Sequence, residues 1–199
     1  MDLSGVRRYS PSRLDSADRE AAVLAPIIQQ GDRYEILFTK RSEQLGTHPG
    51  QMSFPGGGRE PEDQDLQATA LREAHEEIGL NPHEAEIIGA VDDKETVTRY
   101  LVRPFVGVIP DREYTRDEYE VAEIVRLDVE DLTMRRNYES EYRDHPEYGP
   151  LRIHFFHVDG YTVWGATGEM LAQLLELTTA WEIPPAVDRV ADPDAELPI

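Results

Sequence analysis

The stretch "LREAHEEIGL", residues 71–80, decides how the rest of this chain is interpreted. Its apolar positions recur at the spacing of a helix that packs on a core, and they are Leu71, Ala74 and Ile78. Gly79 follows them as a natural left-handed C-cap. We therefore expect a helix from about Asp65 to Glu77.

Three glutamates share one face of this expected helix, since Glu73, Glu76 and Glu77 stand at i, i+3 and i+4. Like charges at this spacing repel by about a few tenths of a kcal/mol per pair. We expect the three carboxylates to point away from the core. One interpretation is a solvated acidic stripe. The other is a site for a hard cation such as Mg²⁺, which prefers carboxylate oxygens and retains water and substrate phosphates as further ligands.

Two neighbouring features favour the cation site. Arg72 adjoins the glutamates, where it can pair with a carboxylate or a phosphate. The loop "FPGGG", residues 54–58, lies upstream, and its glycines let the backbone approach a ligand closely. The sequence therefore supports a site formed by the helix and this loop.

Composition limits the possible classes of protein. The 199 residues suffice for one domain. The chain has no cysteine, and its N-terminus lacks an apolar signal segment. We therefore expect a cytoplasmic protein without a membrane span. Forty acids against twenty bases give a net charge of −20, which disfavours nucleic-acid binding. The charge is interpreted as adaptation to a high-salt cytoplasm, and the alternative is an ordinary acidic protein.

Apolar runs and turn residues divide the chain into elements. We expect a loosely ordered segment over residues 1–19, one folded domain over 20–182 and a flexible acidic tail over 183–199. A hairpin is expected from 21–30 and 34–40. The other expected strands are 51–54, 85–91, 102–109, 121–127 and 151–158, and a final helix is expected over 166–181. Strands interleaved with two main helices predict an α/β sandwich.

The residues from Gly56 to Leu80, "GGGREPEDQDLQATALREAHEEIGL", resemble the Nudix box. Every fixed position from Arg72 to Leu80 matches. The first half departs from the pattern, because Asp63 stands where the family has glutamate and the spacer to Arg72 is one residue longer. The resemblance implies an α/β/α sandwich with a mixed sheet, a Mg²⁺ or Mn²⁺ cofactor, and hydrolysis of a diphosphate bond in a nucleoside diphosphate derivative. It also implies a possible homodimer.

The same resemblance assigns roles to residues of the box. Glu73 and Glu77 would ligate the metal from successive turns, together with the backbone carbonyl of Gly57. Glu76 would be a further ligand or the group that accepts the proton of the attacking water. Arg72 would orient Glu73 or hold a carboxylate by a two-pronged contact, and Asp63 would be mainly structural.

A second stretch, "LFTKRSEQLGTHPGQMSFPGG" over residues 37–57, resembles the coenzyme A diphosphatase branch of the family, although Gly46 replaces its second arginine. The branch implies hydrolysis of coenzyme A or acyl-coenzyme A to 3′,5′-ADP and 4′-phosphopantetheine. It implies substrate contacts from a set of four residues, which are Arg41, Phe54, Gly56 and Gly57. Arginines that could hold phosphates are Arg41, Arg72, Arg99 and Arg103.

Two alternatives to this branch stay open. Because Gly46 and Asp63 depart from the pattern of the branch and of the box, another nucleotide derivative stays open as the substrate. The alternatives are ADP-ribose, NADH, a dinucleoside polyphosphate or a damaged nucleotide. A module that binds a nucleotide without cleaving it is the other alternative, although such modules usually lose glutamates of the box and this chain retains all three.

Overall fold

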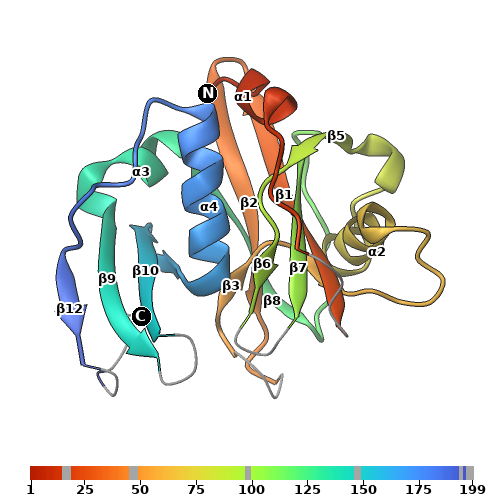
Figure 1. Cartoon of the computed structure of the whole chain (residues 1–199). Coiled ribbons are helices and arrows are strands. Elements are labelled where there is room, and N and C mark those ends of the chain that lie inside the picture. The colour runs from red at the N-terminus through yellow and green to blue at the C-terminus, as the bar shows by residue number, and fades with distance from the viewer. Residues whose placement is uncertain (15–18, 45–48, 97–99, 146–148, 193–194, 196–199) are drawn as a thin grey trace.

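The computed structural model describes residues 1–14, 19–44, 49–96, 100–145, 149–192 and 195. Its elements lie in layers, in the order second sheet, helix α4 (Gly165–Thr178), main sheet and helix α2 (Leu66–Ile78) (Figure 1). The expected α/β sandwich with a mixed sheet is confirmed. A second sheet, which the sequence did not predict, covers the far side of α4.

Eight of the described strands form the main sheet, with the order β3-β2-β1-β7-β5 and three strands paired to its members. Strand β1 runs parallel to β7 and antiparallel to β2 and β4, which makes the sheet mixed. The strands are β1 (Glu20–Gln30), β2 (Arg33–Arg41), β3 (Met52–Ser53), β4 (Gly56–Gly58), β5 (Glu86–Ala90), β6 (Lys94–Glu95), β7 (Leu101–Ile109) and β8 (Val121–Asp128).

The second sheet has four described strands in the order β11-β10-β9-β12. They are β9 (Tyr138–His145), β10 (Gly149–Val158), β11 (Tyr161–Val163) and β12 (Arg189–Ala191). Short helical segments connect the larger elements, and they are α3 (Val129–Thr133), η1 (Pro82–Glu84) and η2 (Arg135–Asn137). No helix in the described part of the chain is long and apolar enough to cross a membrane.

Helix α2 forms where the sequence predicts it, and both of its ends are capped. The side chain of Asp65 accepts a hydrogen bond of 2.8 Å from the backbone N–H of Ala68. Gly79 has φ 65° and ψ 25°, and its N–H donates back to the last turn of the helix. The helix buries Leu66, Ala70, Ala74 and Ile78 against the main sheet. These contacts fix the orientation of the glutamate face.

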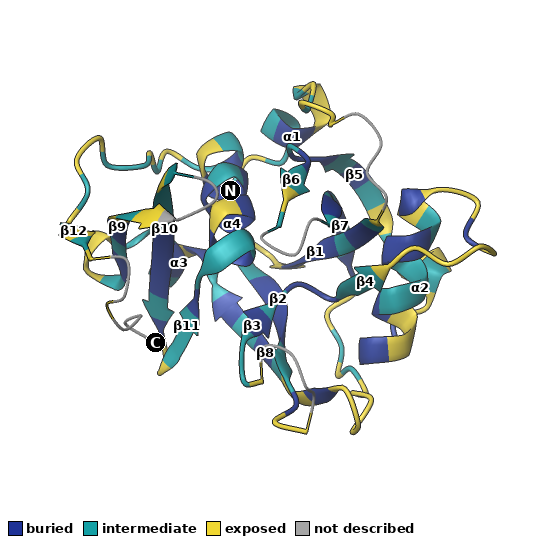
Figure 2. Ribbon diagram, turned by 60° about the horizontal axis from the view of Figure 1, so that its bottom comes forward, coloured by how far each residue is buried: buried dark blue, intermediate teal, exposed yellow. Residues whose placement is uncertain are grey.

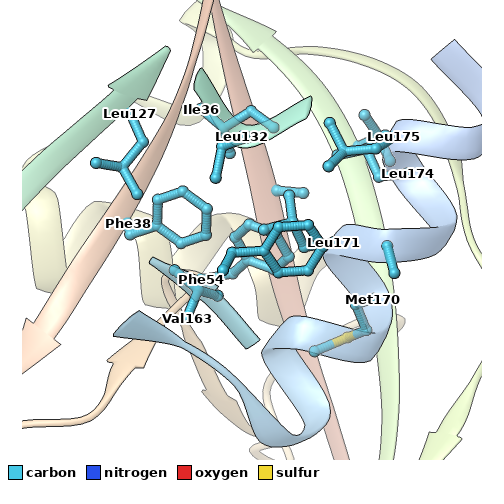
Figure 3. Packing of buried hydrophobic residues seen from close by; sticks show 14 of the residues in the cluster. Ile36, Phe38, Phe54, Leu127, Leu132, Val163, Met170, Leu171, Leu174 and Leu175 are labelled. Carbon is cyan, nitrogen blue, oxygen red and sulfur yellow. The ribbon is translucent and has the colours of Figure 1, made fainter. Parts of the chain in front are cut away.

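The larger core lies between the main sheet, α4 and the second sheet. Figure 3 shows Phe38 and Phe54 packed against Met170 and Leu171 of α4. Strands β1 and β7 of the main sheet are mostly buried, and β4 lies beside α2 at one end of the sheet (Figure 2). Because apolar packing is dense on both faces, the main sheet is a rigid support for the segments at its ends.

Regular structure is present in the described parts of both segments expected to be loose. Residues Ser4–Arg8 form helix α1, whose Val6 is only 1% exposed and contacts the glycine backbone of β5 at Gly89. In the expected tail, β12 runs parallel to β9, and Arg189 donates to the buried carboxylate of Glu141 at 2.6 Å. Short helices and strands of this kind are stabilised by tertiary packing, which periodicity in the sequence does not report.

Candidate functional site

The glycines of β4 bring the backbone against the glutamate face of α2. The N–H of Gly56 donates to Oε2 of Glu77 at 3.2 Å. A Cβ atom at Gly57 would lie only 2.5 Å from Oε1 of Glu73, so this position has no room for a side chain. The glycine run therefore allows two carboxylates to lie directly against a strand.

The expectation that all three carboxylates point away from the core is wrong. The Glu77 residue is 5% exposed, and the Glu73 side chain is 14% exposed. Only Glu76, with 55% of its side chain exposed, faces solvent. The reason is that β4 covers the helix beside its apolar stripe, so the two glutamates closest to that stripe are buried with it.

Burial and mutual repulsion disfavour the charged forms of these two carboxylates. Desolvation, and then the charge of Glu73, raise the pKa of Glu77 to about 8. Desolvation also raises the pKa of Glu73, against the opposing effect of Arg72. Two adjacent buried carboxylates that lack sufficient positive charge are suited to a divalent cation with oxygen ligands, such as Mg²⁺ or Mn²⁺. The donor set therefore fits the expected metal.

Glu76 does not complete a three-carboxylate site in this structure. Its Oε2 accepts a hydrogen bond of 3.0 Å from Nη1 of Arg72. Among the residues that the structure describes, no three carboxylate or imidazole side chains converge closely enough to hold a metal ion alone. The structure thus brings Glu73 and Glu77 together and places Glu76 to one side.

Arg72 is bound by the box itself. Its Nε and Nη2 donate to both oxygens of Asp63, at 3.0 and 3.1 Å, in a two-pronged contact. It also lies 3.0 Å from Glu73 and donates to the carbonyl of Gly58 at 2.9 Å. With these contacts made, Arg72 orients Glu73 and ties the helix to β4.

Asp63 is the buried partner in this network. It accepts further hydrogen bonds from the Thr69 hydroxyl and the Glu60 N–H, each at 2.9 Å. The hydrogen bonds from Arg72 lower the pKa of Asp63 to about 2, so it stays charged. Although the sequence has aspartate at this position and a longer spacer, the carboxylate reaches both Arg72 and the first turn of α2.

The segment that precedes β8 forms a second wall of the site. The N–H of Asp117 donates to the carbonyl of Glu77 at 2.9 Å, and the N–H of Ser42 donates to the carbonyl of Glu120 at 2.9 Å. The charge of Glu120 raises the pKa of both Glu73 and Glu77. A fourth carboxylate therefore faces the box from a distant part of the sequence.

Arg41, at the end of β2, is a basic residue beside this wall, where it lies opposite Val121. Its charge lowers the pKa of Glu77, opposing the effect of burial. Its Nε is buried and makes no hydrogen bond with any residue in the described ranges. A buried N–H without an acceptor is costly, and a phosphate oxygen would supply one.

Sequence reasoning missed Asp117 and Glu120. They belong to "RDEYEV", residues 116–121, which is one of many acidic segments in a chain of net charge −20. Only the pairing of β8 with β2 brings this segment next to the box, since Arg41 lies opposite Val121. No local signal distinguishes it.

Two expected substrate contacts need correction. The Phe54 ring is 2% exposed and stacks on Phe38 with 5.1 Å between centroids, so it is a core residue and not a substrate surface (Figure 3). Arg103 donates two hydrogen bonds, of 2.9 and 2.7 Å, to the buried Asp93, which also binds Arg13. Arg103 therefore anchors the N-terminal segment. Gly46 and Arg99 lie outside the described residues.

Comparison with known proteins identifies the family of the chain. The model of the NUDIX domain family matches residues 18–148, which is more than half of the chain. The chain belongs to the Nudix family and is a pyrophosphohydrolase; members of this family generally use divalent metal ions such as Mg²⁺ or Mn²⁺.

Two relatives carry the same family name. A protein of Enterobacter sp. (strain 638) named "Uncharacterized Nudix hydrolase NudL" is 36% identical over 160 residues, covering 78% of this chain and 81% of the relative. The protein of the same name from Photorhabdus laumondii is 34% identical over 168 residues, covering 83% and 88%. A solved Ap4A hydrolase from C. elegans has a TM-score of 0.48 and 18% identity, covering 57% of this chain and 82% of that one.

Proposed function

We propose that this Nudix enzyme cleaves the diphosphate bond of coenzyme A or acyl-coenzyme A, which yields 3′,5′-ADP and (acyl-)4′-phosphopantetheine. The observation that carries the proposal is that the buried Glu77 and the largely buried Glu73 share one face of α2, and that the charge of Arg41 acts on Glu77 while its Nε has no hydrogen-bond partner among the described residues. Negative groups that hold a cation, near a guanidinium N–H that has no acceptor among the described residues, are suited to a diphosphate with its metal. The choice of coenzyme A rests on the resemblance of residues 37–57 to that branch.

The residues of the box have separate proposed roles. Glu73, Glu77 and the Gly57 carbonyl would hold Mg²⁺ or Mn²⁺, and Glu76 would be a further ligand or the acceptor of the proton of water. When bound, the ion neutralises phosphoryl charge and lowers the pKa of the attacking water. The oxygen of water bonds to one phosphorus as the bridging P–O bond breaks, and the bridging oxygen leaves on the other phosphate.

The remaining residues position either a metal-binding carboxylate or the substrate. Arg72 positions Glu73 by its contacts with Asp63 and Gly58. Arg41 would bind a phosphate oxygen through its free Nε, and the Gly56 and Gly57 backbone would lie along the substrate. A cytoplasmic, high-salt setting and a homodimer belong to the same proposal, and they rest on composition and on the family resemblance.

Product analysis tests the substrate. Purified protein is incubated with coenzyme A and Mg²⁺ at several salt concentrations, and 3′,5′-ADP and 4′-phosphopantetheine are measured by chromatography. ADP-ribose, NADH and a dinucleoside polyphosphate are assayed in parallel. Faster hydrolysis of one of these would overturn the choice of coenzyme A, and hydrolysis of none of the panel would overturn the proposed reaction.

A pair of glycine substitutions tests the close contact between β4 and α2. In Gly57→Ala the new Cβ would meet the Glu73 carboxylate at 2.5 Å, so we expect kcat/KM to fall by about a hundredfold through displacement of that carboxylate. In Gly58→Ala the new Cβ has nothing within 4 Å, so activity should change by less than about twofold. Equal activity of the two variants would contradict the assignment of Glu73 to the site.

A further inference from the structure

Tyr119 presents an aromatic side chain to solvent in the turn before β8. It is 65% exposed, and it is one of four large hydrophobic side chains that are exposed in the described part of the chain. The others are Leu14 near the N-terminus, and Tyr142 and Val190, which lie opposite each other on β9 and β12. Tyr119 alone among them lies in the segment that binds the box.

The turn that carries Tyr119 is held on both sides. Oδ1 of Asp117 accepts hydrogen bonds from the N–H groups of Tyr119 and Glu120, at 2.8 and 3.0 Å. The Asp117 N–H binds the carbonyl of Glu77, and the Glu120 carbonyl binds Ser42, each at 2.9 Å. The backbone at Tyr119 is thereby fixed to α2 on one side and to the residue after β2 on the other, even though the ring is exposed.

This placement limits what Tyr119 can contact. Its Cα is two residues from Asp117, and therefore within about 8 Å of the Cα of Asp117, whose N–H binds the main-chain carbonyl of Glu77. A nucleoside diphosphate that places its phosphates at Glu73, Glu77 and Arg41 must place its base to one side, because the ribose separates the two. A neutral aromatic ring can hold that base by stacking without adding charge.

We propose that Tyr119 is the ring on which the nucleobase of the substrate stacks, and that it determines the preference of this enzyme for nucleotide over base-free diphosphates. The inference rests on the proposed function, because it takes Glu73, Glu77 and Arg41 as the position of the diphosphate. The surrounding charge supports it: Glu118 and Glu120 flank Tyr119, and Arg116 lies 4.0 Å from Glu118. The segment stays negative, with three acids against one arginine over residues 116–120, so a negatively charged group of the ligand is disfavoured there and a neutral base is not.

Binding of two probes tests the role of Tyr119 separately from catalysis. ADP and inorganic diphosphate are titrated by calorimetry, with Mg²⁺, into the parent protein and three variants. For Tyr119→Ala we expect the Kd of ADP to rise about tenfold, while the Kd of inorganic diphosphate stays within about twofold. Tyr119→Phe keeps the stacking face and should bind both probes like the parent. Tyr142→Ala removes a similarly exposed tyrosine far from the box and should change neither.

The outcomes separate this inference from the proposed function. If Tyr119→Ala leaves ADP binding unchanged, weakens both probes equally, or turns a dimer into a monomer in sedimentation, the inference is wrong. Absence of ADP binding to the parent protein would also overturn it. Loss of ADP affinity in Tyr119→Ala without hydrolysis of any diphosphate in the panel would reject the proposed reaction and leave the stacking role standing.

Discussion

Replacement of Glu77 by glutamine is expected to lower kcat by about a thousandfold without loss of the fold. Glutamine has the same shape, and its amide oxygen can still accept the hydrogen bond from the Gly56 N–H. The negative charge on which a divalent cation depends is lost, however. Steady-state rates with Mg²⁺ measure the loss of activity, and calorimetric titration with Mn²⁺ measures the loss of metal affinity independently of turnover.

The stability of Glu77→Gln distinguishes a metal ligand from a purely structural residue, because loss of a structural residue would destabilise the fold. Because burial and Glu73 disfavour the charged form of Glu77, the metal-free variant should be at least as stable as the parent in urea at pH 8. Glu62→Gln, at an exposed position before α2, is the matched control and should alter neither rate nor stability. A fully active Glu77→Gln enzyme, or one that unfolds, would contradict the role proposed for this carboxylate.

Replacement of Arg72 by alanine is expected to have the largest effect on stability. The substitution leaves Asp63 charged and buried without its two-pronged partner, which should lower the free energy of unfolding by about 3 kcal/mol. Arg72→Lys should lower the free energy of unfolding by less than Arg72→Ala does. The lysine keeps the positive charge, but its ammonium group cannot make the same two parallel hydrogen bonds. Urea denaturation followed by circular dichroism measures both changes.

Arg59 offers the matched control for Arg72. It pairs with Glu20 at 2.8 Å, but both side chains are partly exposed, so Arg59→Ala should cost no more than about 1 kcal/mol. If the two alanine variants were equally stable, Arg72 and Asp63 would not form the tie between α2 and β4 that the structure shows.

The Asp63 pair also predicts a dependence on pH. Because its pKa in the folded protein is lowered to about 2 from 3.8, the pair stabilises the fold fully above about pH 4. That contribution is lost as the pH falls from 3.8 through about 2. Asp63→Asn, which cannot titrate, should therefore show a smaller loss of stability over this acidic range than the parent. Equal losses in the two proteins would show that Asp63 is not held charged by Arg72.

Local sequence patterns predicted the elements that carry the box, because their signals lie within a few residues of one another. The α2 helix, its Gly79 cap and the β1–β2 hairpin follow from short-range periodicity and turn chemistry. Periodicity and turn chemistry left out α1, β9 and β12, and the family resemblance assigned Phe54 to the substrate. Those errors concern long-range packing, such as Phe54 on Phe38 or β12 beside β9.

The sequence by itself determined that this chain is a Nudix protein, since every fixed position from Arg72 to Leu80 lies in one continuous helix and its cap. Only the tertiary structure decided which glutamates are buried, and that Asp117 and Glu120 form the second wall. The physical reason is that a helical pattern sets which residues share a face. What that face meets is set by the approach of β4 and by the pairing of β8 with β2, and these bring together residues that are far apart in the chain.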